Sequence, residues 1–155
     1  TRRSSDLTIT QGDADQEEIV SFSLVEDNEE TLLVGVTMMD TLVRSPEQTK
    51  PAAEDMRSRM IKNYPNVTIN VSASTVSTKS GNYSAAKMTF SEPIDGKSVV
   101  IYLFCVPSKD GRSFRSYAVQ INYAARRSES DGVELLKAMT FIKPADAPAA
   151  VTAPE

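Results

Sequence analysis

The chain has 155 residues, of which 40% are hydrophobic and 25% charged, and it carries a net charge of −4. These values are typical of an ordinary folded domain, and a chain of this length buries about 70% of its unfolded surface. Its longest apolar run falls well short of the roughly 18 residues that a membrane-spanning helix needs. The sequence contains no histidine, which excludes catalytic mechanisms built on an imidazole base and metal sites built on imidazole ligands.

Charge is distributed unevenly along the chain. Residues 1–40 contain ten acidic and two basic residues, which gives this part a net charge of −8 and leaves +4 for the rest. An acidic balance argues against a nucleic-acid-binding protein, which needs a basic surface to displace counterions. We instead expect the acidic part to bind another protein. The candidate partner-binding acids are Asp13, Asp15, Glu17, Glu18, Glu26, Asp27, Glu29 and Glu30.

The first four of these acids follow Gly12 at a spacing that would also suit a hard cation, because alternate carboxylates can face one Ca²⁺ ion. The rest of the twelve-residue calcium-loop pattern is missing. A solvated acidic loop, or contact with a basic partner surface, is therefore the favoured interpretation, and calcium binding is the alternative. We predict no metal site and no cofactor.

The N-terminal third predicts three short strands. Residues 7–10 alternate between apolar and polar side chains, and residues 19–25 place Val20, Phe22 and Leu24 on one face. Residues 31–39 show the same period of two. The acidic turn at residues 26–30 predicts that the second and third strands form a hairpin.

A helix is predicted next, and two prolines complicate its start. Ser45 as N-cap, Pro46 at the first helical position and Gln48 form a helix-start signature. Because Pro51 would break an established helix, we expect one short turn and then a new helix over residues 51–63. Its buried stripe is predicted to contain Ala53, Met56, Met60 and Tyr64.

Four further strands follow, joined by turns that contain glycine. From residue 66 the apolar side chains of Val67, Ile69 and Val71 return at period two, and further strands are predicted over residues 83–91, 99–106 and 114–123. Residues 99–106 are apolar at every position. Such a run is typical of a central strand that is covered on both faces.

The last element is a helix over residues 129–141, with Ser128 or Ser130 as its cap. Val133, Leu136 and either Met139 or Thr140 are predicted to face the core. Pro144 prevents continuation, so residues 1–143 form one α+β domain and residues 144–155 a flexible Ala/Pro-rich tail. The predicted fold is an antiparallel sheet of about six or seven strands, with the two helices packed on one face or at its edges.

Few residues suggest chemistry. Arg112 and Arg115, together with Arg126 and Arg127, predict a basic edge that suits an acidic protein or a phosphate, although solvated strand ends would look the same. We include Arg112 and Arg115 among the partner-binding candidates. The single cysteine, Cys105, lies in an apolar strand, where an inert thiol is expected. We predict no catalytic residues and no enzyme activity.

The order of two strands, a helix, four antiparallel strands and a C-terminal helix resembles the PsbP-like superfamily. The resemblance covers residues 19–144, and its best pieces are the segment from Tyr64 to Val67 and the closing segment from Glu134 to Phe141. The chain departs from the usual pattern at its start, because it contains no tryptophan. The resemblance implies a binding or assembly role without catalysis, and it assigns no site residues.

The prediction for function is a non-catalytic, exported domain that binds another protein through surface complementarity, in an accessory, inhibitory or immunity-type role. A secretion chaperone, which needs an exposed apolar concave sheet face, and a carrier of a small ligand or Ca²⁺ are the alternatives. The chain begins with Thr1 rather than methionine. We therefore expect that a signal segment or lipid anchor was removed and that the protein is periplasmic or otherwise extracytoplasmic.

Overall fold

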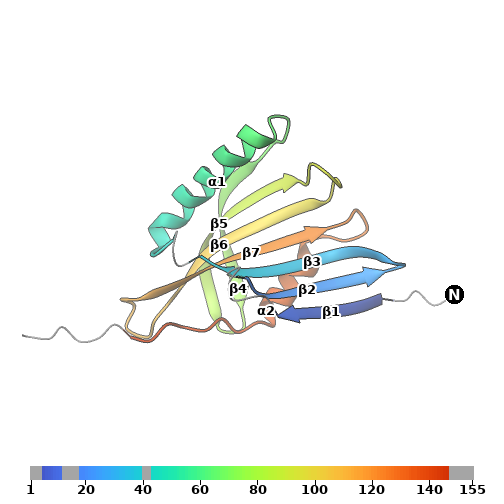
Figure 1. The fold of residues 1–155 in the computed structure, drawn as a ribbon. Coiled ribbons are helices and arrows are strands. Elements are labelled where there is room, and N and C mark those ends of the chain that lie inside the picture. The colour runs from blue at the N-terminus through green and yellow to red at the C-terminus, as the bar shows by residue number, and fades with distance from the viewer. Residues whose placement is uncertain (1–4, 12–17, 40–42, 147–155) are drawn as a thin grey trace, which may run out of the picture.

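The computed structural model describes residues 5–11, 18–39 and 43–146, with side chains from residue 20 onward. Seven strands form one antiparallel sheet in the order β1-β2-β3-β7-β6-β5-β4, and two α-helices pack against it (Figure 1). The predicted α+β class is therefore confirmed. The elements are β1 (Ser5–Gln11), β2 (Glu18–Glu26), β3 (Glu29–Met38), a 3₁₀ turn (Pro46–Gln48), α1 (Thr49–Asn63), β4 (Asn70–Thr78), β5 (Gly81–Ser91), β6 (Ser98–Pro107), β7 (Phe114–Tyr123) and α2 (Glu129–Lys137).

The two helices lie on opposite faces of the sheet, and each covers its own apolar cluster (Figure 1). The strand β6 belongs to both clusters: Val99, Ile101 and Leu103 face α1, whereas Val100, Tyr102 and the other even-numbered residues face α2. The prediction that residues 99–106 form a central strand covered on both faces is confirmed. The prediction that both helices share one face or lie at the edges is wrong, because each face of β6 needs its own cover.

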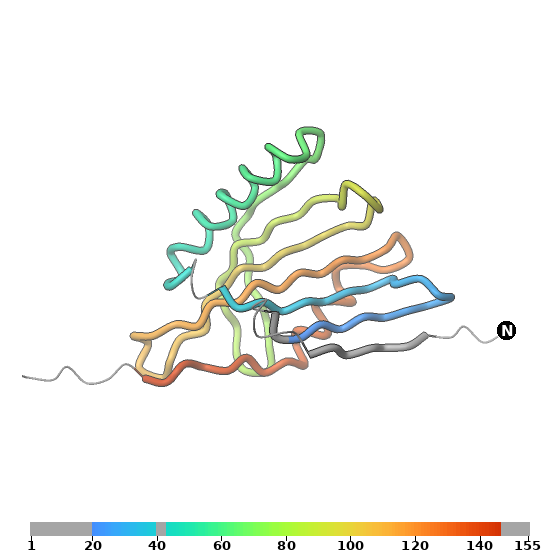
Figure 2. The backbone as a smooth tube through the Cα atoms, in the orientation of Figure 1, coloured from blue at the N-terminus to red at the C-terminus, as the bar shows by residue number. Residues whose placement is uncertain are grey.

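The topology places the last strand between the two halves of the sheet. After the β2–β3 hairpin, the chain crosses through α1 to the far edge, and β4 to β7 then return strand by strand until β7 pairs with β3 (Figure 2). The hairpin turn between β2 and β3 has Asp27 and Asn28 at φ of 52° and 63°. Two consecutive residues of positive φ are typical of a type I′ turn, which suits a two-residue hairpin.

The helices differ from prediction at their ends. The short turn before α1 is confirmed, but α1 begins at Thr49 because Pro51 falls in its first turn, where no intrahelical bond is lost. Ser45 makes no capping bond through its side chain. Tyr64, predicted to be buried, is 43% exposed because α1 ends just before it.

The C-terminal helix is shorter than predicted. It ends at Lys137, Ala138 forms a turn, and residues 139–146 continue without helix or strand. Ser128 is its N-cap, within a capping box that it forms with Asp131. From residue 147 the predicted tail lies outside the described residues.

Candidate functional site

An apolar groove lies on the α2 side of the sheet, open to solvent on one side. Its volume is about 360 Å³, and apolar atoms form most of its lining. One wall comes from β2, β3 and β7, and the other comes from the chain that follows α2. The lining residues are Val20, Phe22, Val36, Tyr117, Ala138, Met139, Thr140, Phe141 and Ile142.

The second wall is held in place by backbone and side-chain hydrogen bonds. The amide of Lys79, in the turn between β4 and β5, donates to the Met139 carbonyl at 2.9 Å. The Phe141 amide donates to the Ser80 hydroxyl at 3.1 Å, and the Tyr117 hydroxyl donates to the Ile142 carbonyl at 3.0 Å. These bonds hold residues 139–142 against the β4–β5 turn and β7, near the lower edge of the molecule in Figure 1.

Aromatic packing anchors the same segment. The Phe141 ring is 6% exposed and lies edge-on to Phe104, with the ring centroids 5.0 Å apart. It also meets Tyr117 at 4.9 Å. Such edge-to-face pairs add about 0.5–1.5 kcal/mol each to the burial of the rings. The neighbouring Ile142 remains 68% exposed beside the groove, so this wall presents apolar surface to solvent.

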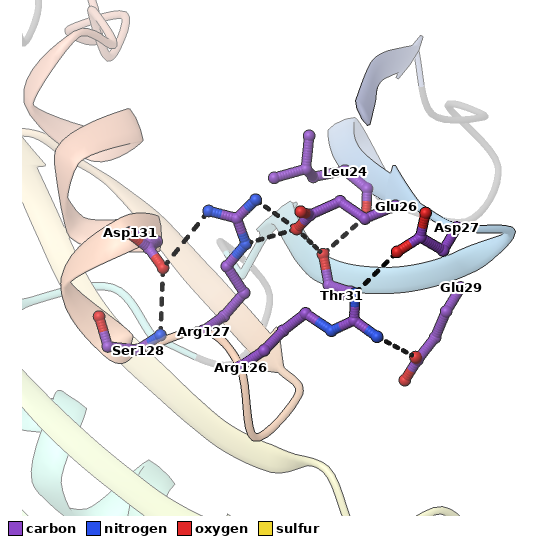
Figure 3. Close-up of polar contacts among 9 residues, drawn as sticks. All are labelled: Leu24, Glu26, Asp27, Glu29, Thr31, Arg126, Arg127, Ser128 and Asp131. Atoms are coloured by element: carbon purple, nitrogen blue, oxygen red, sulfur yellow. Dashed lines mark hydrogen bonds and ion pairs between the residues drawn. The ribbon is translucent and has the colours of Figure 1, made fainter. Parts of the chain in front are cut away.

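The acidic hairpin turn is a different kind of surface from the one predicted. Figure 3 shows that arginines which follow β7 meet the acids of this turn. The Arg126 guanidinium lies 3.5 Å from Asp27 and 3.1 Å from Glu29. Glu26 is buried and accepts hydrogen bonds from Arg127 and from the Thr31 hydroxyl. Three of the predicted docking acids are therefore already paired within the chain.

These contacts also control the charge of Glu26. The hydrogen bond from Thr31 and then those from Arg127 lower the pKa of Glu26, against the opposing effect of burial. Arg127 further approaches Asp131 of α2 at 3.9 Å. The cluster thus links the β2–β3 turn to the first turn of α2.

The other candidate residues do not join this cluster. Glu30 is half-buried in β3, and the side chain of Glu18, at the start of β2, lies outside the described residues together with Asp13, Asp15 and Glu17. Arg112 and Arg115 lie at the start of β7, whereas Arg126 and Arg127 follow its end. The four arginines therefore do not form one basic edge, because the eight strand residues 116–123 separate Arg115 from the loop that carries Arg126 and Arg127.

A second polar cluster joins β5 and β6 to the start of α2. The Lys87 ammonium lies 2.8 Å from Glu129 and 5.7 Å from the centre of the Tyr102 ring, and the Tyr102 hydroxyl donates to Glu129. Burial raises the pKa of Tyr102, and the hydrogen bond to Glu129 raises it further. Burial also raises the pKa of Glu129, but the hydrogen bonds from Lys87 and Tyr102 outweigh it, so the pKa lies below its ordinary value.

These shifts keep each group in its ordinary charge state. A phenol with a raised pKa is a poor nucleophile, and a carboxylate with a lowered pKa is a weaker base. The cluster therefore favours attachment of α2 over acid–base chemistry. Cys105 is also engaged, since its thiol is buried and lies 3.3 Å from the Ser116 hydroxyl.

In residues 5–11, 18–39 and 43–146, carboxylates and the cysteine form no group of three that would suit a metal ion. Neither α-helix within these ranges has the length and apolar character needed to cross a membrane.

Sequence reasoning missed the groove as a site. It placed Val20 and Phe22 on one strand face and assigned residues 138–141 to a helix, so it did not bring the two segments together. Residues 138–142 read Ala-Met-Thr-Phe-Ile, a sequence without the apolar/polar alternation that would distinguish extended chain from helix. Comparison of the sequence with models of known protein families, and with curated proteins, finds no match.

Proposed function

We propose that this protein is a non-catalytic binding domain that holds an apolar segment of another protein in the groove between β2 and residues 138–142. The groove is the observation that supports this proposal. It is open, it is lined mostly by apolar atoms, and Ile142 at its rim is 68% exposed. Exposed apolar surface next to a concave site is typical of protein-binding surfaces.

The sequence suggests two binding modes, one through the acidic hairpin turn and one through an apolar concave surface. Ion pairs within the chain make the first mode less favourable. A charged protruding loop would dock through free carboxylates, but Glu26, Asp27 and Glu29 are paired with Arg126 and Arg127. A basic partner would compete with Arg126 for Asp27 and Glu29, which are half exposed, and with Arg127 for the buried Glu26. The apolar groove needs no such exchange, so it supports the chaperone-like alternative more strongly than the charged one. The resemblance to the PsbP-like superfamily implies the same non-catalytic class of role, and export remains part of this proposal.

Photo-crosslinking tests the proposal with a matched control. A benzophenone amino acid replaces Ile142 at the groove, or Ile94, which is 87% exposed in the turn between β5 and β6. In cells of the source organism, we expect the probe at position 142 to form one dominant protein adduct that is absent at position 94. Mass spectrometry of the adduct should map the link to an apolar segment of the partner.

Adducts of equal yield at both positions, or a link to a basic segment that meets the acidic turn, would overturn the groove as the binding site.

A small-ligand carrier is the second candidate, because about 360 Å³ lies at the lower end of volumes that hold small molecules. Native mass spectrometry of the purified protein detects a bound small molecule directly and would support that candidate.

A further inference from the structure

The strand β4 forms one edge of the sheet, and its backbone groups divide into two sets. The Glu92 amide donates to the Lys97 carbonyl at 2.7 Å, so the even-numbered residues of β5 direct their amides and carbonyls toward β6. The odd-numbered residues of β5 therefore bond to the even-numbered residues of β4. It follows that Val71, Ala73, Thr75 and Ser77 direct their amides and carbonyls away from the sheet.

Among the described residues, a hydrogen bond from outside the sheet reaches this edge at its start. The Arg57 side chain donates to the Ile69 carbonyl at 2.9 Å, which occupies the last outward-facing carbonyl before β4 begins. From Val71 to Ser77, no hydrogen bond from another described segment reaches the outward groups. The helix α1 packs on the face formed by β4, β5 and β6, and α2 contacts β4 from the opposite face, where Val76 belongs to the same apolar cluster as Leu136 (Figure 1).

The composition of β4 is unusual for an exposed edge. Its nine residues, NVSASTVST, contain no charge and no proline, and its pairing with β5 has no bulge. Native proteins normally protect edge strands with charged residues, prolines or bulges, because an open and regular edge pairs with other strands. The opposite edge strand, β1, does include a charged residue, Asp6.

The same strand is complementary to a second copy of itself. In an antiparallel pair centred on Ser74, Val71 meets Ser77 of the other copy and Ala73 meets Thr75, so every outward amide and carbonyl gains a partner. A two-fold axis brings like residues near one another, and a charge in β4 would therefore meet its own copy. Because β4 is uncharged, this repulsion is absent.

We propose that two copies of this chain associate through their β4 edges, with Ser74 on the two-fold axis, to form one continuous antiparallel sheet. The contact is separate from the groove on the α2 side, so it is independent of the function proposed above. Each copy keeps its own helices on the two faces of the joined sheet.

Cysteine crosslinking tests whether Ser74 lies on the two-fold axis of the dimer. The two Ser74 positions form a pair without hydrogen bonds, whose Cα atoms lie about 4.5 Å apart, within the range of a disulfide. We expect Ser74→Cys to give a disulfide-linked dimer under mild oxidation. Ser72→Cys, at a more exposed position on the same strand face, should not, since the two copies of residue 72 lie about 14 Å apart. The native Cys105 is buried and does not interfere.

Introduction of positive charge into β4 tests whether this edge forms the dimer contact. The double substitution Ala73→Lys/Thr75→Lys places lysines directly opposite one another, and we expect the dimer dissociation constant to rise by about tenfold or more. Asn82→Lys/Ser84→Lys is the matched control, because these exposed residues lie on the same face of β5, opposite Ser77 and Thr75. It should leave the dissociation constant within about twofold.

Analytical ultracentrifugation over a range of concentrations measures the dimer dissociation constant of the wild type and of the two double lysine variants. A wild-type protein that remains monomeric throughout, together with no Ser74→Cys crosslink, would overturn the proposal. So would a dimer that the β4 lysines leave intact, or crosslinking of Ser72→Cys as efficient as that of Ser74→Cys.

Discussion

Replacement of Gly132 by alanine tests how closely α2 packs against the sheet. Gly132 is buried in the middle of the helix, and a Cβ atom there would lie 2.5 Å from Cγ2 and 2.8 Å from Cδ1 of Ile121. Ile121 is 0% exposed within the core on this face. It is also β-branched, which restricts its rotamers, so it cannot move aside freely.

Two opposing effects set the change in the free energy of unfolding that Gly132→Ala causes. Alanine favours the helix over glycine by about 1 kcal/mol. Overpacking of a filled core costs about 1–3 kcal/mol, and a contact as short as 2.5 Å belongs in the upper part of that range. We therefore expect Gly132→Ala to lower the free energy of unfolding by about 1–2 kcal/mol, which corresponds to a fall in Tm of about 2–8 °C.

Urea denaturation of Gly132→Ala, Ile121→Ala and the double variant measures the clash directly. The double variant should be more stable than the sum of the single effects predicts, because the truncated Ile121 side chain leaves room for the new methyl group. Gly35→Ala is the control, since a Cβ atom there has no neighbour within 4 Å. A Gly132→Ala variant more stable than the wild type, as at an exposed helix position, would refute the reasoning.

Three further predictions concern the polar clusters and the hairpin turn. Since the pKa of Glu26 lies below its ordinary value, its stabilising contribution is complete above the unfolded glutamate pKa of about 4.3 and is lost as the pH falls through the folded value. Urea denaturation should therefore show Arg127→Met as destabilised at pH 7, and the difference from wild type should shrink at pH 3; an undiminished difference would contradict this. Because the pKa of Tyr102 is raised, spectrophotometric titration to pH 11 should show the same phenolate absorbance for Tyr102→Phe as for wild type, whereas a loss of about one tyrosine's signal would show that Tyr102 ionises normally. At φ of 63°, Asn28→Val should lower the free energy of unfolding by about 1–2 kcal/mol, while Asn28→Gly should leave it unchanged or slightly raised. Equal stabilities of these two variants would argue against the turn conformation.

Local patterns in the sequence predicted most of the elements. The alternation of Val20, Phe22 and Leu24 predicted β2, and the apolar run at residues 99–106 predicted the covered central strand, since both signals depend on neighbouring residues alone. The predicted bounds of β7, residues 114–123, agree with the structure. Helix ends were predicted less well, because the Met139 carbonyl and the Phe141 amide bond to Lys79 and Ser80 instead of continuing the helix.

The candidate sites depended on contacts that sequence patterns do not contain. The acids of the hairpin turn looked free in the sequence, but Arg127 meets Glu26 across 101 residues and Arg126 meets Glu29 across 97. The groove likewise exists only because the chain after α2 returns beneath β2 and β3.

The sequence by itself determined the strands, the two helices and the covered, interior position of β6, because periodicity and turn residues act over a few neighbours. Only the tertiary structure decided that β7 lies between β3 and β6, that the helices cover opposite faces, and that β4 is left as an edge. These features arise from pairing between distant segments, where one strand face can be satisfied by several partners. The choice among them is made by packing of the whole core rather than by any local signal.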